Sequence, residues 1–424
     1  MVFCVCLFIA AGLYAAGQKE APKIETEKIS GTVSFWTFLD PKDTGPRSVV
    51  QSKLVEEFEQ KNGVKVDVIH KYWADIPNDF IRAVAGGVAP DVTRLSMPKS
   101  WRQMVAADTL GPISDYTTFT EADKKDWVLD WDVYSLNGKK YALPISYTFV
   151  ALWSNPKHLQ EVGEKIPKTW DELINVASKL TQKGYVGYVT SVSKATEVNS
   201  LFEFFDSAYY GLGKKPVDDK GFVTWGDSEE GVKVMELLKK LVDAGAIPKE
   251  TLAWNVDDSH RGYMAGKVSM MNYGTMRVFT TRKGGQEVTV SAMPGWTADK
   301  PSPSYTSGWH LAMAKTSKNP RAAAEFIKYM TSPDGQIMNA KVAGEMPSRL
   351  SPYSDPWFSS SPEGKEMARW KELLNKVGVM MEFFDDWLPM RQALADAAQE
   401  IILRNAPIRE TLKKHADNFN KQRK

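Results

Sequence analysis

The stretch that decides the fold of this chain is GKKYALPISYTFVALWSNPKHLQEVGEKIPKTWDEL, from Gly138 to Leu173. It opens with a strand-like apolar run and continues through an aliphatic crossover into a loop flanked by prolines. The loop ends at a capping box, from Thr169 to Glu172, which marks the start of a helix. Apolar residues at helical spacing follow, so we expect a strand and then a helix with one buried face.

A second block, SGWHLAMAKTSKNPRAAAEFIKYMTSPDGQ from Ser307 to Gln336, repeats this order of strand, turn and amphipathic helix. Asn319 and Pro320 are typical of a helix start. Near the N-terminus, GTVSFWTFL predicts a strand, the next apolar stripe predicts a helix that stops at Gly63, and VKVDVI predicts another strand. Strands that alternate with helices in this way indicate an α/β protein.

The composition limits the possible classes of protein. A chain of 424 residues exceeds one ordinary core, so we expect at least two lobes. Hydrophobic residues make up 43% and charged residues 25%, which is typical of a globular protein. The net charge is +2 and no basic stripe stands out, so the sequence gives no indication of a nucleic-acid partner.

Residues 1–17 are uncharged and mostly apolar, and they end in Ala15, Ala16 and Gly17 before a polar segment. This pattern predicts a signal peptide, followed by a linker over residues 18–30. The segment lacks a basic n-region, which leaves open a start upstream of Met1. Both cysteines, Cys4 and Cys6, fall inside it, so the mature chain would contain no disulfide. We expect a soluble periplasmic protein, with an uncleaved N-terminal anchor as the alternative.

The two blocks, in this order, resemble the extracellular solute-binding proteins of ABC importers, and most of all the maltose-binding-protein-like group called family 1. The likeness covers nearly the whole mature chain. It implies a two-lobed α/β fold of the periplasmic-binding-protein type (type II-like), with the ligand cleft between the lobes. By the resemblance, the N-terminal lobe comprises 31–148 plus 305–348 and the C-terminal lobe 149–304 plus 349–424. Three crossings would form the hinge, near Thr148–Ala151, Pro303–Tyr305 and Met346–Arg349.

No catalytic or metal-binding constellation stands out in the sequence. The five histidines are scattered, without the spacing of a zinc site, and no cofactor motif occurs. The segment from Gly262 to Lys267 is one residue too short for a phosphate-binding loop, and Val268 stands where Ser or Thr would bind magnesium. We interpret it as a turn between a helix and a strand, and the chain as a binding protein without enzymatic activity.

The chain is rich in aromatic residues, with 14 Trp, 15 Tyr and 18 Phe, several of them beside polar residues at the ends of predicted elements. Ligands of open α/β lobes bind at such ends. A flat ring can cover the C–H face of a sugar, while Asn, Asp, Glu and Arg exchange hydrogen bonds with its hydroxyls. This combination favours a neutral polyol over an anion, which would need convergent arginines or a free helix N-terminus.

Several candidate ligand residues follow from strand ends, where the resemblance places contacts. Trp36 ends the first strand, on the face opposite Val33 and Phe35, and Asp40 follows in a loop. Ser96 ends another predicted strand, and Tyr147 precedes the first crossing. For Trp36 and Tyr147 the alternative is packing in the core or under the hinge.

The remaining candidates lie in the second half of the chain. The segment LAWNVDDSHRGYMAGKVSMMNYG resembles the part of the family that lines the second lobe. The candidates are Trp254, Asn255, Asn272, Tyr273, Trp309 at the returning strand, and Glu345 and Arg349 beside the third crossing. Arg349 could instead pair across the hinge, and Asp258 could cap a helix that begins near Ser259.

The resulting hypothesis is a monomeric receptor that captures a sugar or short oligosaccharide by hinge closure and delivers it to the transmembrane subunits of an ABC permease. One alternative keeps the fold and changes the ligand to a polyamine, a phosphorylated polyol or a metal chelate. A remote alternative is a secreted carbohydrate-active enzyme, which would need a pair of carboxylates across the cleft.

Overall fold

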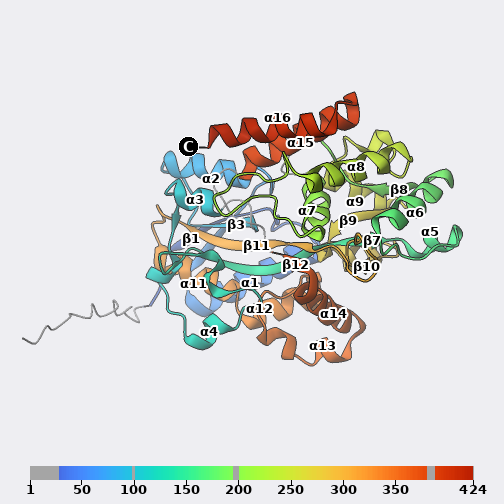
Figure 1. Ribbon diagram of the computed structural model, residues 1–424. Coiled ribbons are helices and arrows are strands. Elements are labelled where there is room, and N and C mark those ends of the chain that lie inside the picture. Colours follow the sequence, from blue (N-terminus) through green and yellow to red (C-terminus); the bar gives the residue numbers. More distant parts are fainter. Residues whose placement is uncertain (1–27, 98–100, 194–199, 380–386, 424) are drawn as a thin grey trace, which may run out of the picture.

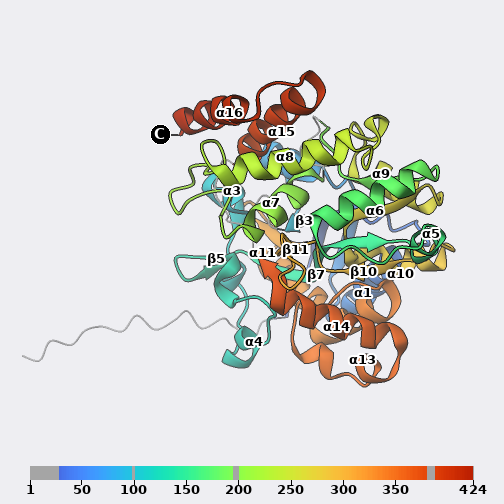
Figure 2. The ribbon, with the colours of Figure 1, turned by 45° about the vertical axis from the view of Figure 1, so that its right-hand side comes forward.

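The computed structural model describes residues 28–97, 101–193, 200–379 and 387–423 (Figure 1). The predicted signal peptide and most of the predicted linker lie outside these residues. The described chain forms two lobes, built on the two halves of one ten-stranded sheet and covered by helices (Figures 1 and 2). The expected α/β architecture is confirmed.

The first lobe is built on the strand order β2-β1-β3-β11-β7. Its strands are β1 (Thr32–Thr37), β2 (Lys65–His70), β3 (Val92–Met97), β7 (Ala142–Ser154) and β11 (Ser304–Ala314). β1 runs parallel to β2 and β3, whereas β11 runs antiparallel to its neighbours β3 and β7. β11 comes from far along the chain and lies between β3 and β7, in the interior of this sheet. A short strand, β4 (Leu110–Gly111), pairs with its end.

The second lobe continues the sheet through β9 (Val268–Gly274) and β8 (Val186–Val189). β10 (Thr289–Ser291) also pairs with β7, and β12 (Gly378–Val379) pairs with the start of β11. A separate hairpin is formed by β5 (Ser135–Leu136) and β6 (Lys139–Lys140).

The α-helices cover both faces of these sheets. In chain order they are α1 (Pro46–Asn62), α2 (Ile76–Ala85), α3 (Trp101–Ala106), α4 (Glu121–Lys125), α5 (Pro156–Glu161), α6 (Trp170–Gln182), α7 (Leu201–Gly211), α8 (Glu229–Asp243), α9 (Val256–Met264), α10 (Val278–Lys283), α11 (Pro320–Met330), α12 (Pro333–Met338), α13 (Trp357–Ser360), α14 (Pro362–Val377), α15 (Trp387–Arg404) and α16 (Ile408–Gln422). The last two lie together beside α8 (Figures 1 and 2).

Local sequence explains where several helices begin and end. α1 stops at Gly63, whose φ of 68° is a left-handed conformation that glycine adopts at little cost. The predicted capping box of α6 is present, because the Thr169 hydroxyl accepts from the Glu172 N–H and the Glu172 carboxylate accepts in return. The segment from Gly262 to Lys267 is the predicted turn, between α9 and β9.

The cap of α9 corrects one expectation. The helix begins at Val256, with Asn255 as its N-cap, and Asp258 is the third helical residue, not the cap. The Asn255 side chain accepts from the Asp258 N–H at 2.8 Å, and the Asp258 carboxylate accepts from the Asn255 N–H at 2.9 Å. This reciprocal pair satisfies two backbone donors at once, which a start at Ser259 would leave open.

The long strand β7 joins the lobes. Its residues from Ala142 to Phe149 pair with β11, and those from Val150 to Ser154 pair with β9, so the change of partner falls between Phe149 and Val150. Beside it, the Thr148 and Thr275 hydroxyls lie 3.1 Å apart. The Tyr147 N–H donates to the Met346 carbonyl at 2.9 Å, which ties the segment after α12 to the same place. The lobe boundaries themselves remain a prediction.

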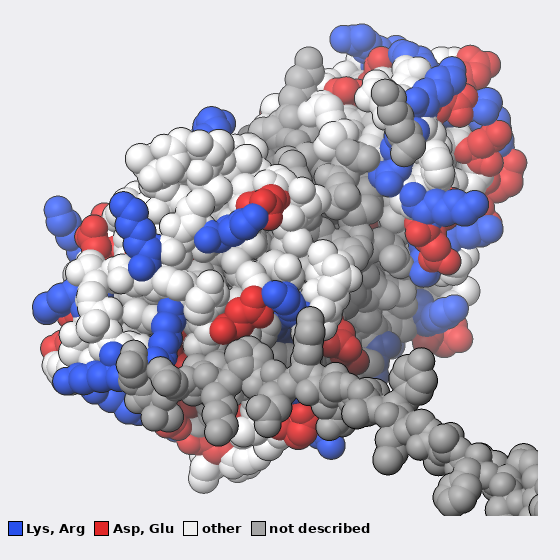
Figure 3. All heavy atoms as spheres, turned by 90° about the vertical axis from the view of Figure 1, so that its left-hand side faces the viewer, with Lys and Arg blue, Asp and Glu red and all other residues white. Residues whose placement is uncertain are grey.

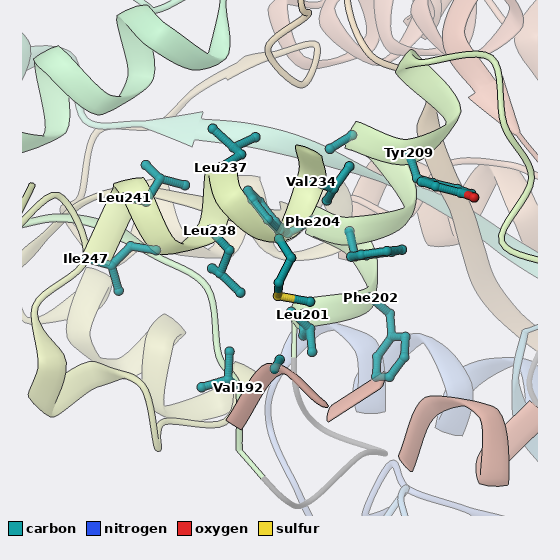
Figure 4. Close-up of a cluster of buried hydrophobic side chains, with 14 of the residues drawn as sticks. Val192, Leu201, Phe202, Phe204, Tyr209, Val234, Leu237, Leu238, Leu241 and Ile247 are labelled. Carbon is teal, nitrogen blue, oxygen red and sulfur yellow. The ribbon is translucent and has the colours of Figure 1, made fainter. Parts of the chain in front are cut away.

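Each lobe has its own hydrophobic core. The largest cluster of buried side chains lies in the second lobe, where α7 and α8 pack together (Figure 4). In the first lobe, Val33 and Phe35 pack on one side of β1 and Trp36 packs on the other, as the alternation predicts. These rigid cores hold the strand ends and loops that face each other across the gap between the lobes.

Candidate functional site

A cavity of about 410 Å³ lies between the lobes. The first lobe supplies the loop after β1, the start of α1, the loop after β2, the end of β3 and the first half of β11. The second lobe supplies the start of α7, one face of α9, and the chain from β9 into α10. The lining includes Phe38, Asp43, Arg47, Trp73, Ser96, Glu203, Asp257, His260, Asn272, Tyr273, Arg277, Gly308 and Trp309. The volume lies within the range of small-molecule sites, roughly 300–1,000 Å³.

Aromatic rings form the wall of the first lobe. The ring centroids of Phe38 and Trp309 are 4.1 Å apart, with the planes inclined by 42°. Trp73 meets Trp309 edge to face at 6.3 Å. We call Phe38, Trp73 and Trp309 the aromatic wall. Trp309 is only 9% exposed, so Phe38 and Trp73 present more of the wall to the cavity.

Two arginines and one carboxylate lie beside this wall. The Arg47 Nε is 2.6 Å from one oxygen of Glu345, and the Arg94 Nη2 is 3.4 Å from the other. Burial opposes ionisation of Glu345, but the two guanidinium groups and a hydrogen bond from Ser146 outweigh it and hold its pKa below the usual value. Burial lowers the pKa of Arg94 to about 10, which is still well above 7, so Arg94 keeps its proton at pH 7.

The wall of the second lobe combines an ion pair with stacked rings. Arg277 donates to Asp257 at 3.0 Å, so their charges compensate each other. His260 stacks on Tyr273, with centroids 5.5 Å apart. Burial, and then the charge of Arg277, lower the pKa of His260 to about 4, so the imidazole is neutral at pH 7. Its Nδ1 faces the Arg277 donor and its Nε2 lies 2.9 Å from the Thr281 hydroxyl, which assigns the proton to Nε2.

A glycine and a bulge bring β11 to the cavity. Gly308 has a φ of 148°, and a Cβ there would lie 2.2 Å from the Ser146 carbonyl oxygen. Only glycine permits this close approach of two backbones. At the next residue the register between β11 and β7 shifts, because Trp309 pairs with Ser146 and His310 pairs with Pro144. Such a bulge redirects side chains and here leaves Trp309 at the edge of the cavity.

Four of the predicted ligand residues line this cavity: Ser96, Asn272, Tyr273 and Trp309. The side chain of Asn272 is held from within its own lobe. It accepts from the Tyr188 hydroxyl at 3.0 Å and donates to the Ser200 carbonyl at 3.0 Å. Burial raises the pKa of Tyr273 to about 12, so its hydroxyl keeps its proton at pH 7.

Three predicted residues from the first half of the chain lie outside the cavity lining. Trp36 packs against Phe80 on the other face of its sheet, and the ammonium of Lys71 lies over its ring at 4.5 Å. Asp40 accepts from the N–H of Lys42 in a turn. Tyr147 is 2% exposed and packs beneath the crossing, which is the alternative that the sequence left open.

The last four predicted residues also lie outside the lining. Trp254 packs with the neighbouring core, and Asn255 caps α9. Glu345 is buried behind Arg47. Arg349 pairs with Asp126 at 3.2 Å and donates to the Thr331 carbonyl at 2.8 Å. Its guanidinium group therefore anchors the segment after α12 to its neighbours.

Sequence reasoning missed much of the lining, including Phe38, Arg47, Trp73, Asp257, His260 and Arg277. Arg47 follows Pro46 at the start of α1, where the helix points its first turn at the cavity. Trp73 follows the end of β2, so the strand-end rule could have found it.

Among the described residues, His, Cys, Asp and Glu side chains form no group of three or more that could hold a metal ion. Within the same part of the chain, no helix combines the length and the apolar composition needed to cross a bilayer.

Two lobes that enclose a cavity of aromatic and hydrogen-bonding groups define a receptor for a small solute. The chain belongs to the bacterial extracellular solute-binding proteins, because the model of that family matches residues 53–366. The suspected relationship to the solute-binding proteins of ABC importers is therefore confirmed.

Individual proteins show the extent of the likeness. The galactooligosaccharide-binding protein of Bacillus subtilis is 22% identical over 94% of this chain and 91% of its own length. A probable amino-acid ABC transporter periplasmic-binding protein of Sinorhizobium fredii is 29% identical, but that match spans 45% of this chain and 42% of the relative. The maltose-bound structure of MalE3 from T. maritima superposes with a TM-score of 0.79, at 21% identity, over 92% of this chain and all of that one. That structure confirms the two-lobed fold.

Proposed function

We propose that this protein is the periplasmic receptor of an ABC importer and that it captures a neutral sugar or a short oligosaccharide. The observation that carries the proposal is the composition of the cavity. Aromatic rings line one side, and each arginine of the lining has a carboxylate partner: Arg47 pairs with Glu345, which the buried Arg94 shares, and Arg277 pairs with Asp257.

The pairing of the cavity arginines favours a neutral ligand. An anionic solute such as a phosphorylated polyol would need cations without a carboxylate partner, and a polyamine would need unpaired carboxylates. A neutral polyol needs neither, because its hydroxyls exchange hydrogen bonds with the edges of ion pairs, amides and neutral imidazole. Phe38 and Trp73 would cover the C–H faces of its rings.

The names of the relatives support a sugar over an amino acid. The match to the galactooligosaccharide-binding protein runs through nearly the whole chain, whereas the match to the amino-acid protein covers less than half of it. A free amino acid would also require one unpaired cation and one unpaired carboxylate in the cavity.

The proposed mechanism is hinge closure about the segments that join the lobes. A ligand that contacts Phe38 and Trp73 on one side and Asp257, Asn272 or Tyr273 on the other favours the closed form by its higher affinity for that form. The closed receptor would then dock, as a monomer, on the transmembrane subunits of the permease.

We propose no reaction on the bound sugar. Three carboxylates line the cavity: Asp43, Glu203 and Asp257. Asp257 is paired with Arg277, and Asp43 accepts from the Gly45 N–H and the Ser48 hydroxyl at the start of α1. Asp257 and Asp43 are therefore committed to structural bonds, whereas glycoside hydrolysis needs two carboxyl groups, an acid and a base, that face the scissile bond.

A thermal-shift screen of residues 18–424 tests the proposal, with neutral mono- and oligosaccharides, amino acids, polyamines and phosphorylated polyols as probes. A ligand at 100 times its Kd adds about 2.7 kcal/mol to the free energy of unfolding. We expect a shift with a neutral sugar and a Kd that barely changes with salt, since no net charge is neutralised. Phe38→Ala should abolish the shift, and Tyr116→Ala, at an exposed site elsewhere, should keep it.

A thermal shift with an amino acid or a charged solute alone would refute the neutral sugar as the ligand and would leave the receptor role intact. Steady hydrolysis of an aryl glycoside, lost in Asp257→Asn, would overturn the binding role.

A further inference from the structure

Glu345 does not line the cavity, yet it lies at the centre of the charged cluster beside it. We propose that Glu345 is a positioning residue for ligand recognition, acting through Arg47 and Arg94 to hold the aromatic wall in place and to set the charge preference of the cavity. This inference rests on the proposed sugar-binding function. It assigns to Glu345 a role different from the direct ligand contact that the sequence suggested.

The geometry joins one carboxylate to two rings through two cations. The guanidinium carbon of Arg47 lies 4.9 Å from the centre of the Phe38 ring and 5.7 Å from that of Trp309. The corresponding distances for Arg94 are 4.9 and 5.8 Å. Both guanidinium groups therefore contact the same pair of rings, and Glu345 bonds to both of them. Cation–π attraction at this range favours the observed orientation of the rings.

The carboxylate also keeps two like charges together. Arg47 and Arg94 converge on one acceptor, and the side chains of Arg94 and Glu345 are 2% and 1% exposed. Without Glu345, the two cations would repel each other, and the burial of Arg94 would leave this repulsion only partly screened. The cluster carries one net positive charge with Glu345 present and would carry two without it.

Glu345 is held by the segment that joins the lobes. The preceding residue, Gly344, has a φ of 72°, and a Cβ there would lie 2.6 Å from the ring of Phe279 in α10. The following residue, Met346, accepts a hydrogen bond from Tyr147 of β7. The backbone on both sides of Glu345 is therefore fixed, and its carboxylate has little freedom to follow a displaced arginine.

This arrangement predicts a change of selectivity and not only a loss of affinity. In Glu345→Gln, which keeps the shape of the side chain, the extra positive charge favours a ligand with a carboxylate over its neutral counterpart. In Arg94→Gln, the remaining pair of Arg47 and Glu345 is neutral, and the preference moves the other way. A purely structural role would weaken both ligands by the same factor.

Calorimetry on residues 18–424 tests the selectivity. The probes are the neutral sugar that gives the largest thermal shift and the uronic acid of the same sugar. For Glu345→Gln we expect about a tenfold loss of affinity for the neutral sugar and a rise of at least about tenfold in the uronate-to-neutral affinity ratio. Arg94→Gln should lower that ratio. Glu363→Gln, an exposed carboxylate change on α14, is the matched control. Equal weakening of both probes, or an unchanged ratio, would overturn the charge role.

A second measurement needs no ligand. The emission of Trp309 is isolated as the difference between a protein and its Trp309→Phe variant, in the wild-type and in the Glu345→Gln background. We expect this difference spectrum to change when Glu345 is replaced, because the cations beside the indole move. An unchanged spectrum would overturn the positioning role. If no sugar bound the wild-type protein, the proposed function would fail, while this spectrum would still decide the role of Glu345.

The charge-balanced variant Glu345→Gln/Arg94→Gln covers the case in which Glu345→Gln does not fold. It retains one net positive charge but lacks the carboxylate that clamps Arg47. It should keep the wild-type affinity ratio and show the altered Trp309 spectrum; a wild-type spectrum in this variant would overturn the positioning role.

Discussion

The substitution Trp309→Ala separates two roles that an aromatic residue at a cavity can have. Trp309 is 9% exposed and packs against Phe38, Trp73 and the first-lobe core. Replacing a buried tryptophan by alanine costs about 3–5 kcal/mol of stability. Because one edge of this indole borders a cavity, we expect the low end, about 3 kcal/mol.

The direct effect on ligand affinity should be smaller. A tryptophan exposes roughly 250 Å² when free, so 9% corresponds to about 20 Å² that a ligand can cover in this conformation. At about 25 cal/mol per Å², this area contributes about 0.5 kcal/mol, or a factor of two to three in Kd. Phe38 loses its support as well, so we expect a total loss of about tenfold.

Urea unfolding and calorimetry measure the two effects on the same samples. Trp73→Ala is the comparison, because Trp73 is more exposed and presents more of its ring to the cavity. We expect Trp309→Ala to lose more stability and less affinity than Trp73→Ala. If Trp309→Ala unfolded like the wild type while its affinity fell a hundredfold, the indole would be the principal ligand platform and this reasoning would be refuted.

Three further substitutions test the geometry. Gly308→Ala should lower the free energy of unfolding by about 3 kcal/mol, because the added Cβ would meet the Ser146 carbonyl. Gly63→Ala is the control: nothing lies within 4 Å of its added Cβ, so it should cost about 1 kcal/mol. Equal losses of stability in urea unfolding would contradict the close approach at Gly308. Asn255→Ala should lower the free energy of unfolding by about 1 kcal/mol, because the cap of α9 is lost, and should leave the Kd within about twofold. A large loss of affinity in calorimetry would show that Asn255 contacts the ligand. Burial lowers the pKa of His310 to about 3. Below about pH 6.5 the unfolded chain therefore binds a proton that the folded chain does not bind, and the free energy of unfolding falls as the pH is lowered. Between pH 7 and pH 5 the wild type should lose about 2 kcal/mol more than His310→Gln in urea titrations, and parallel curves would show that His310 does not titrate in this way.

The sequence predicted the fold well because its signals are local. The capping box at Thr169, the stop at Gly63 and the alternation of Val33, Phe35 and Trp36 each involve neighbouring residues. The start of α9 was wrong by three residues because Asn255 and Asp258 are both good caps. Only the reciprocal bonding of the pair, which depends on the backbone of both, decides between them.

The site was less predictable because it forms where segments that are distant in the sequence come close together in space. Strand ends led to Ser96 and Trp309, which line the cavity. The same rule chose Trp36, but the alternation of β1 turns it to the other face of the sheet. Arg47 gives no signal in the sequence, because its place follows from the direction of α1 and from a carboxylate almost 300 residues later.

The position of β11 has a consequence for how the chain folds. β11 lies between β3 and β7, so the first sheet stays split until residues 304–314 are available. A nascent chain that has passed β3 and β7 therefore keeps two unpaired strand edges until the part of the second lobe between β7 and β11 has been made. Closing so large a loop is slow, which makes completion of the first lobe a late event and leaves the long intermediate open to chaperones. A truncation before residue 304 would remove the centre of the first lobe and not merely its end.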